Sequence, residues 1–209
     1  CIIGLNKKVD LETAQKINET LFVECILAPE YDKNALELLK SKKNRRILAY
    51  GKLVSFNQEK QIKMIRGGAL VQTPDKIFED EKNSKIVTEK KPTEEQMKSL
   101  KFAWKVCKHV KSNAIVVAQN EKTVGISEGQ TSRVDSVIKA IKKAGERAQE
   151  AVLASDAFFP KPDGVEEAAK AGILAIIQPG GSKYDPEVIN LANKYKIAMV
   201  FTGVRHFKH

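Results

Sequence analysis

The chain has 209 residues, 42% hydrophobic and 30% charged, so it can bury a core and does not have the composition typical of a disordered protein. No apolar run approaches the roughly 18 residues that a membrane helix needs, and three scattered cysteines exclude a disulfide framework and suit a reducing cytoplasm. The net charge of +10 invites a nucleic-acid interpretation, but no stretch interleaves the lysines with stacking aromatic residues. We therefore expect the positive charge to lie mainly on solvated helix faces. The alternative is that it attracts a small polyanion such as a phosphorylated substrate.

The first half contains one clear strand-helix-strand pattern. Residues 22–28 are an apolar strand ended by Pro29, and Asp32 caps a helix that carries Ala35, Leu36 and Leu39. A second strand follows at 47–50. The chain opens on Cys1 and an apolar run rather than on Met, so we expect residues to be missing upstream.

The second half has a longer alternation. Thr93 and Gln96 form a capping-box pattern ahead of a helix. Gly172 lies where a glycine commonly follows a helix end, and Asp185-Pro186 is predicted to be an N-cap followed by proline at the first helical position. Strands are expected at 114–118, 123–126, 151–155, 173–178 and 197–201, with helices carrying Val134 to Ile141 and starting near Asp163 and Asp185. This alternation predicts an α/β fold with a sheet covered on both faces.

The order of strand, proline, aspartate cap and basic helix end in the first half recurs in residues 173–201. One interpretation is that the unit is duplicated and that its first copy is incomplete. The other is that all strand-helix-strand units share this pattern, without duplication. Residues 76–95 are charged and lack apolar periodicity, so they are the expected connection between units.

Several strong site signatures are absent, including phosphate-binding glycine loops and the cysteine pairs of zinc sites. The polar segments instead follow predicted strands, where α/β sheets bind their ligands. These segments are 129–133, 155–160, 178–182 and 205–209. Arg133 and Arg205 lie at element ends within reach of a ligand, and neither has an obvious carboxylate partner at helical spacing.

At these segments the sequence resembles the carboxy-terminal part of the AICAR transformylase family. The matching motifs are S-N-A-I-V (112–116), G-Q-T-S-R-V-D (129–135), S-D-A-F-F-P (155–160), Q-P-G-G-S (178–182) and M-V-F-T-G-V-R-H-F-K-H (199–209). The segments I-I-G-L-N-K-K-V-D (2–10) and R-G-G-A-L-V-Q (66–72) also resemble the family, so the resemblance spans essentially the whole chain and is looser from 51 to 96.

The resemblance implies transfer of a formyl group from 10-formyltetrahydrofolate to AICAR, giving FAICAR, by an enzyme that is also an IMP cyclohydrolase in purine biosynthesis. It implies two cytidine-deaminase-like subdomains without zinc, and sites shared across a homodimer. Residues 1–75 would be the rest of the first subdomain, 76–95 the connection and 96–209 the complete second one.

The resemblance also assigns residues. Asn113 and His209 would act at the transfer centre; Asn113, Arg133, Phe158 and Arg205 would bind AICAR; Val134, Asp163, Ser182 and Lys183 would contact folate. Formyl transfer passes through a tetrahedral oxyanion, which suits a fixed donor such as the Asn113 amide. No metal, membrane or nucleic acid is expected to take part, and the enzyme should be cytoplasmic.

One departure from the family concerns its catalytic Lys-His pair. The resemblance places the family's catalytic Lys-His pair upstream of the first residue of this chain. Lys108-His109, which precedes S-N-A-I-V, does not match the family's Lys-His motif. We therefore expect this chain to be a fragment that lacks the catalytic pair and has little activity alone. The alternative is a non-catalytic basic module that binds nucleotides or RNA, whose affinity for RNA would fall steeply with salt.

Overall fold

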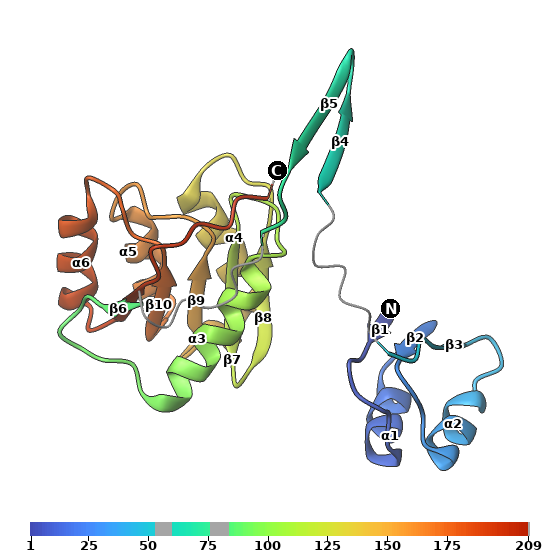
Figure 1. Ribbon diagram of the computed structural model, residues 1–209. Coiled ribbons are helices and arrows are strands. Elements are labelled where there is room, and N and C mark those ends of the chain that lie inside the picture. Colours follow the sequence, from blue (N-terminus) through green and yellow to red (C-terminus); the bar gives the residue numbers. More distant parts are fainter. Residues whose placement is uncertain (53–59, 76–83, 209) are drawn as a thin grey trace. The chain divides into compact units, whose positions relative to one another are not determined.

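The computed structural model describes residues 1–52, 60–75 and 84–208. It divides into two compact units, Cys1–Pro74 and Asp75–His209, and each is described by itself (Figure 1).

The first unit contains a small parallel sheet with two helices. Its elements are β1 (Ile2–Gly4), α1 (Leu11–Glu19), β2 (Cys25–Ala28), α2 (Lys33–Lys40) and β3 (Arg46–Ala49), with strand order β1-β2-β3. Asp10 caps α1 by accepting a hydrogen bond from the Thr13 amide at 2.8 Å. Asp32 is the N-cap residue of α2 as predicted, but its carboxylate pairs with the Lys8 ammonium at 2.7 Å and caps no amide.

The same unit carries the hairpin of β4 (Gln61–Ile65) and β5 (Gly68–Gln72), which pair antiparallel with Ile62 opposite Val71 and Met64 opposite Ala69. Every residue of both strands is exposed. Because side chains alternate between the faces of a strand, these two pairs share one apolar face. The sequence analysis did not predict this hairpin.

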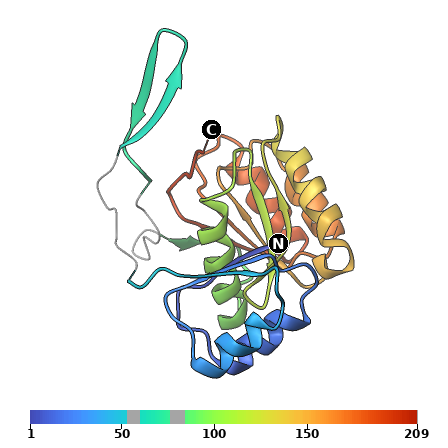
Figure 2. The same ribbon diagram turned by 90° about the vertical axis from the view of Figure 1, so that its right-hand side faces the viewer.

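The second unit is built on a six-stranded mixed sheet with the strand order β6-β11-β10-β9-β7-β8. Its strands are β6 (Lys85–Ile86), β7 (Ile115–Gln119), β8 (Lys122–Ser127), β9 (Val152–Ser155), β10 (Ala175–Gln178) and β11 (Ala198–Phe201). Its helices are α3 (Glu94–Cys107), α4 (Arg133–Ala144), a short 3₁₀ helix (Gly145–Ala148), α5 (Asp163–Lys170) and α6 (Asp185–Lys194). Figure 2 shows α3 (green) on one side of the sheet and α4 (yellow) and α6 (red) on the other.

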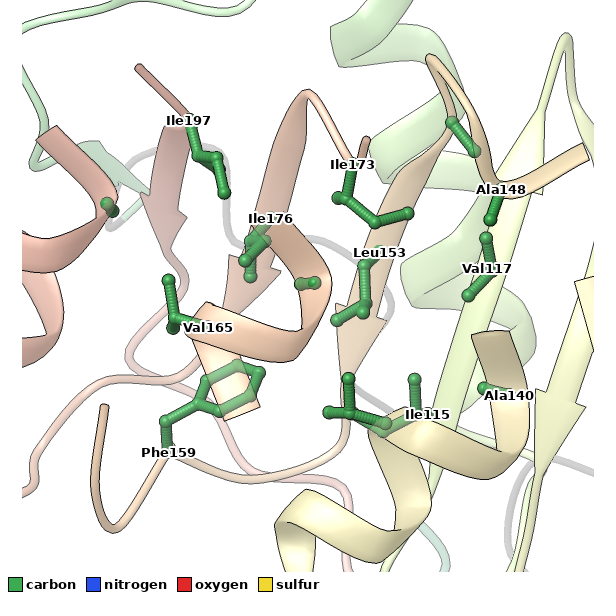
Figure 3. Packing of buried hydrophobic residues seen from close by; sticks show 14 of the residues in the cluster. Ile115, Val117, Ala140, Ala148, Leu153, Phe159, Val165, Ile173, Ile176 and Ile197 are labelled. Carbon is green, nitrogen blue, oxygen red and sulfur yellow. The ribbon is translucent and has the colours of Figure 1, made fainter. Parts of the chain in front are cut away.

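Two hydrophobic clusters cover the two faces of this sheet. On one face α3 contributes Leu100 and Trp104, which pack with Val116 and Ile177. The other face packs against α4, α5 and α6 around Phe159 and Ile176 (Figure 3). Strands β9 and β10 are buried at every position, as the prediction of a sheet covered on both faces required. The α/β class is therefore confirmed.

Glycine allows α4 to approach the edge strand closely. A Cβ atom at Gly125 of β8 would lie 2.1 Å from the Ala140 carbonyl oxygen, so any side chain there would push the helix away from the sheet.

Several local predictions hold and two are wrong. Thr93 and Gln96 form the capping box of α3, and Gly172 follows α5 with a φ of 78°. The strand expected at 22–28 begins only at Cys25. Asp185 is the first residue of α6 rather than its cap, because its carboxylate accepts a hydrogen bond from the Gly181 amide in the preceding loop at 2.7 Å.

Residues 85–86, within the expected connection, pair with β11 as β6, and residues 76–83 of it lie outside the described part. No helix within the described residues is both long and apolar enough to span a membrane.

Candidate functional site

The polar segments singled out in the sequence meet at one edge of the six-stranded sheet. Strands β9, β10 and β11 are parallel, so their carboxyl ends, and the segments that follow them, share an edge. Strand β7 runs antiparallel to β9 with Ile115 opposite Ser155, which brings residues 112–114 to the same edge. Ser127, at the end of β8, pairs with Ile115 and leads into 129–133. One edge therefore carries residues from five strands.

Arg133 and Asp156 form a buried ion pair at this edge. Asp156 follows β9 and is fully buried, and Arg133 opens α4 with 6% of its surface exposed. The Arg133 Nη1 group donates to the Asp156 carboxylate and, at 3.0 Å, to the Ala114 carbonyl oxygen. The same carboxylate accepts from the Ser112 hydroxyl and, at 2.9 Å, from the Ala114 amide. The prediction that Arg133 has no obvious carboxylate partner considered only residues at helical spacing. Its partner in the structure, Asp156, is distant in sequence and follows β9.

Asn113 lies beside this pair and is half-buried. Its Oδ1 atom accepts a hydrogen bond from Arg133 Nη2 at 3.0 Å, and its Nδ2 group donates to the Gln130 carbonyl oxygen at 2.9 Å. The motifs at 112–116, 129–135 and 155–160 are thus joined by side-chain contacts at one point.

Arg205 lies past the end of β11 and stays exposed. Its guanidinium carbon is 4.6 Å from the centroid of the Phe158 ring, a distance typical of a cation–π contact. A Cβ atom at Gly181 would lie 3.6 Å from Arg205 Nη2, so the guanidinium also adjoins the loop after β10. The structure therefore brings Phe158 and Arg205 together, with the arginine charge open to solvent.

Gln178 holds the two loops that flank Arg205. It is fully buried at the end of β10, and its Oε1 atom accepts from the Phe159 amide at 3.2 Å and the Gly180 amide at 3.3 Å. These two bonds connect the loop after β9 with the loop after β10, which fixes the backbone on both sides of the arginine.

The tail after Arg205 is bound to the rest of the unit. The His206 amide donates to the Asp156 carbonyl oxygen at 3.0 Å, and the Lys208 carbonyl oxygen accepts from the Ser112 amide at 2.8 Å. The buried His206 ring lies 4.6 Å from the Trp104 ring, and its Nδ1 atom is 2.5 Å from Asp75 Oδ2. The tail therefore packs at the end of the last strand. His209, one of the two expected transfer-centre residues, lies outside the described residues.

The residues expected to contact folate lie around the same edge on separate elements. Val134 is half-buried in the first turn of α4, and Asp163 is exposed at the start of α5, where its carboxylate accepts from the Gly164 amide at 2.7 Å. The Ser182 hydroxyl accepts from the Tyr184 amide at 3.1 Å, and Lys183 Nζ lies 5.0 Å from the Tyr184 ring centroid.

An open pocket of about 540 Å³ is lined in part by Gln130, whose carbonyl oxygen accepts from Asn113 Nδ2. Its lining consists of Ser127, Glu128, Gln130, Lys139, Lys142 and Lys143. The three lysines give this side of the edge a positive charge, which favours an anionic ligand.

The described part of the chain contains no group of three or more His, Cys, Asp or Glu residues that could hold a metal ion. Cys107 is buried beneath the site, and this burial raises the pKa of its thiol well above the usual value. It is therefore not a nucleophile at neutral pH.

Three residues of this edge were not recognised from sequence. Asp156 and Gln178 belong to the quoted motifs, and His206 to the tail, but none was assigned a role. A polar residue directly after an apolar strand was the available signal for the first two, because such positions are buried at the carboxyl edge of a covered sheet.

A family model and the sequences of curated relatives both match this chain and point to the same family. The family model described as "AICARFT/IMPCHase bienzyme" matches residues 1–143. Proteins titled "Bifunctional purine biosynthesis protein PurH" from Bacillus cereus (strain AH187) and Bacillus thuringiensis (strain Al Hakam) are each 54% identical over 208 residues, covering 100% of this chain. The chain spans 40% of the length of these curated relatives.

Among solved structures, a chain titled "Acinetobacter baumannii RibD, form 2" has a TM-score of 0.36 and 13% sequence identity, and the match covers 51% of this chain and 34% of that one. This similarity is too weak to support a conclusion about fold or function.

Proposed function

Since the chain belongs to the AICARFT/IMPCHase bienzyme family, we propose that it supplies part of the site that transfers a formyl group from 10-formyltetrahydrofolate to AICAR, giving FAICAR in purine biosynthesis. The names of the relatives, bifunctional purine biosynthesis proteins, support this proposal. The whole protein would also be an IMP cyclohydrolase, with this chain corresponding to 40% of the relatives' length.

The observation that carries the proposal is the meeting of Asn113, Phe158 and Arg205 with the 178–182 loop at one edge of the sheet. The exposed Arg205 would bind the phosphate of AICAR, and the Phe158 backbone would receive its amine. The half-buried Asn113 amide would donate to the oxyanion that forms when the amine attacks the formyl carbon. An aromatic amine is a poor nucleophile, so tight orientation by these groups would supply much of the acceleration.

Folate would lie along Val134, Asp163, Ser182 and Lys183, with His209 near the transfer centre. We further propose that residues 96–209 form a cytidine-deaminase-like subdomain without zinc, that 1–75 are the remainder of a similar one, and that complete sites form across a homodimer in the cytoplasm. The α/β architecture and the parallel strand-helix-strand units in both parts support the first two of these proposals.

The alternative function is a basic module that binds RNA or nucleotides without catalysis. The +10 charge and the lysines of the 540 Å³ pocket favour it. The salt dependence of binding distinguishes this alternative from the formyl-transfer proposal, because the affinity of several lysines for RNA falls steeply as the salt concentration is raised.

Calorimetric titration of the chain with AICAR and with its dephosphorylated riboside tests the proposal. We expect the phosphorylated ligand to bind more tightly, and Arg205→Ala to remove this difference by weakening the ribotide about 10- to 100-fold, as expected for one charge-assisted contact. Arg147→Ala, which removes an exposed arginine from the 3₁₀ helix outside the proposed site, serves as the matched control. Equal losses for both ligands in the Arg205→Ala variant would defeat the phosphate assignment. Tight RNA binding that AICAR does not displace would favour the alternative.

A further inference from the structure

The orientation of the Asn113 amide is determined by the chemistry of its two partners. Arg133 Nη2, at 3.0 Å, can only donate, so the atom it contacts must be the amide oxygen. The Gln130 carbonyl oxygen, 2.9 Å from the other atom, can only accept, so that atom must be the amide nitrogen. The usual ambiguity between the two ends of an asparagine amide is therefore removed. One Nδ2 hydrogen serves Gln130, and the second has no partner among the described residues.

Asp156 in turn fixes the guanidinium that fixes Asn113. Both hydrogens of Arg133 Nη1 are used, one by the Asp156 carboxylate and one by the Ala114 carbonyl oxygen. The carboxylate is held by the Ser112 hydroxyl and the Ala114 amide. Because all these atoms are buried and the guanidinium is planar, it can rotate only if several hydrogen bonds break together.

We propose that Asp156 and Arg133 are positioning residues which hold Asn113 as a dedicated hydrogen-bond donor toward a ligand oxygen. A free amide could turn over and present its own oxygen, which would repel an oxyanion. A donor that is already oriented needs no rearrangement when the negative charge develops. The inference rests on the proposed function in placing Asn113 at the formyl-transfer centre, and it gives Arg133 a task apart from direct contact with AICAR.

The first test measures the amide itself in the ¹⁵N-labelled chain, without any ligand. The Asn113 side-chain signals are assigned by their loss in Asn113→Ser, and their hydrogen exchange is compared with that of the exposed Asn44. We expect exchange at Asn113 to be slower by roughly tenfold or more, since its amide is held on both sides. Equal exchange at the two asparagines overturns the proposal, and the exchange itself is measured in the unaltered protein.

The second test removes the positioning contacts. Asp156→Asn abolishes the charge, and Arg133→Lys keeps a charge but loses the fork that reaches two partners. We expect both to shift the Asn113 side-chain signals and to speed their exchange. Val188→Ala is the control, because Val188 is fully buried on α6 and makes no contact with this group. A folded Asp156→Asn chain with unaltered Asn113 signals contradicts the proposal.

The third test uses the full-length enzyme that contains this chain. Asn113→Ala is expected to lower kcat by about 100- to 1000-fold, as loss of one oxyanion donor does. Asp156→Asn alone should lower kcat by roughly tenfold or more, yet add little to Asn113→Ala, because it acts through that residue. If the kcat losses of the two single variants instead multiply in the double variant, Asp156 acts independently of Asn113, and the proposal is overturned. If slow exchange is seen at Asn113 but no variant changes formyl transfer, the proposed function fails while the positioning contacts stand.

Discussion

The two units of the chain differ in how much of their sheets they cover. In the second unit β9 and β10 are buried at every position, and hydrophobic clusters lie on both faces. In the first unit β2 alternates between buried and half-buried positions, and a single cluster packs on the sheet. Its hairpin exposes both strands, and Phe22 is 85% exposed. A buried polar group such as Asp156 with Arg133 is found where both faces are covered, because only there can a carboxylate be fully enclosed by donors.

Separating the units is the strongest test of this contrast. We expect residues 75–209 to unfold in one cooperative transition and residues 1–74 to show little or no such transition. Residues 1–74 form the shorter piece, and a shorter chain buries a smaller share of its surface on folding. A two-stranded hairpin also has only marginal stability alone. Circular dichroism against urea measures both pieces, with the whole chain as the reference. An equally steep and stable transition in residues 1–74 would show that one covered face suffices.

A matched substitution compares the two cores within the whole chain. Ile176 on β10 is fully buried, whereas Ile47 on β3 is only half-buried. Ile176→Ala should lower the free energy of unfolding of its unit by about 2–5 kcal/mol, since it leaves a cavity in a packed interior. Ile47→Ala should cost roughly 1 kcal/mol, because less apolar surface is lost from a site already near water. Urea unfolding of both variants gives the comparison, and similar losses would contradict it.

The same contrast explains what the sequence could predict. The α/β class, the capping box at Thr93 and the shared edge of polar segments follow from local patterns, because strand and helix periods are visible in a few residues. The pairing of Arg133 with Asp156 was not predictable in this way. The two residues are 23 positions apart in sequence, and they meet because β8 and β9, on either side of β7, both end at the same edge of the sheet.

The misassigned cap at Asp185 has a similar cause, since its carboxylate turns to the Gly181 amide in a loop whose path the sequence does not specify. The exposed hairpin was missed although Ile62 and Met64 alternate with polar residues and Gly67 marks the turn.

Helix caps should not follow the contrast between the units. Asp10 accepts from the Thr13 amide in the first unit, and Thr93 accepts from the Gln96 amide in the second. Both bonds lie at exposed helix starts, so Asp10→Ala and Thr93→Ala should each cost about 1 kcal/mol. Thermal unfolding of the two variants is the measurement, with Asp10→Asn and Thr93→Ser as controls that keep an acceptor. A much larger loss at Thr93 would mean that its effect passes into the core beneath α3.

The smallest expected effect is a dependence of stability on pH that arises at His109. The pKa of this imidazole is lowered, first by partial desolvation of the ring and then by the neighbouring Lys108 and Lys208 charges, which outweigh the attraction of Asp75. His206 also faces it and acts in the same direction as the lysines. The folded chain therefore binds a proton here less readily than the unfolded chain, whose histidine has its usual pKa of 6.5.

Stability from this group is complete above pH 6.5 and is lost as the pH falls from there to the lower folded value, because the unfolded state then takes up the extra proton. His109→Gln should flatten this part of the curve while leaving the plateau above neutral pH in place. Urea midpoints between pH 5 and 8 for the two proteins measure the difference, and His206 and the carboxylates cancel because both chains contain them. His109 is exposed, so solvent screening keeps the change small. A stability that rises on acidification in the unaltered chain relative to His109→Gln would reverse the sign and show that Asp75 dominates the two lysines.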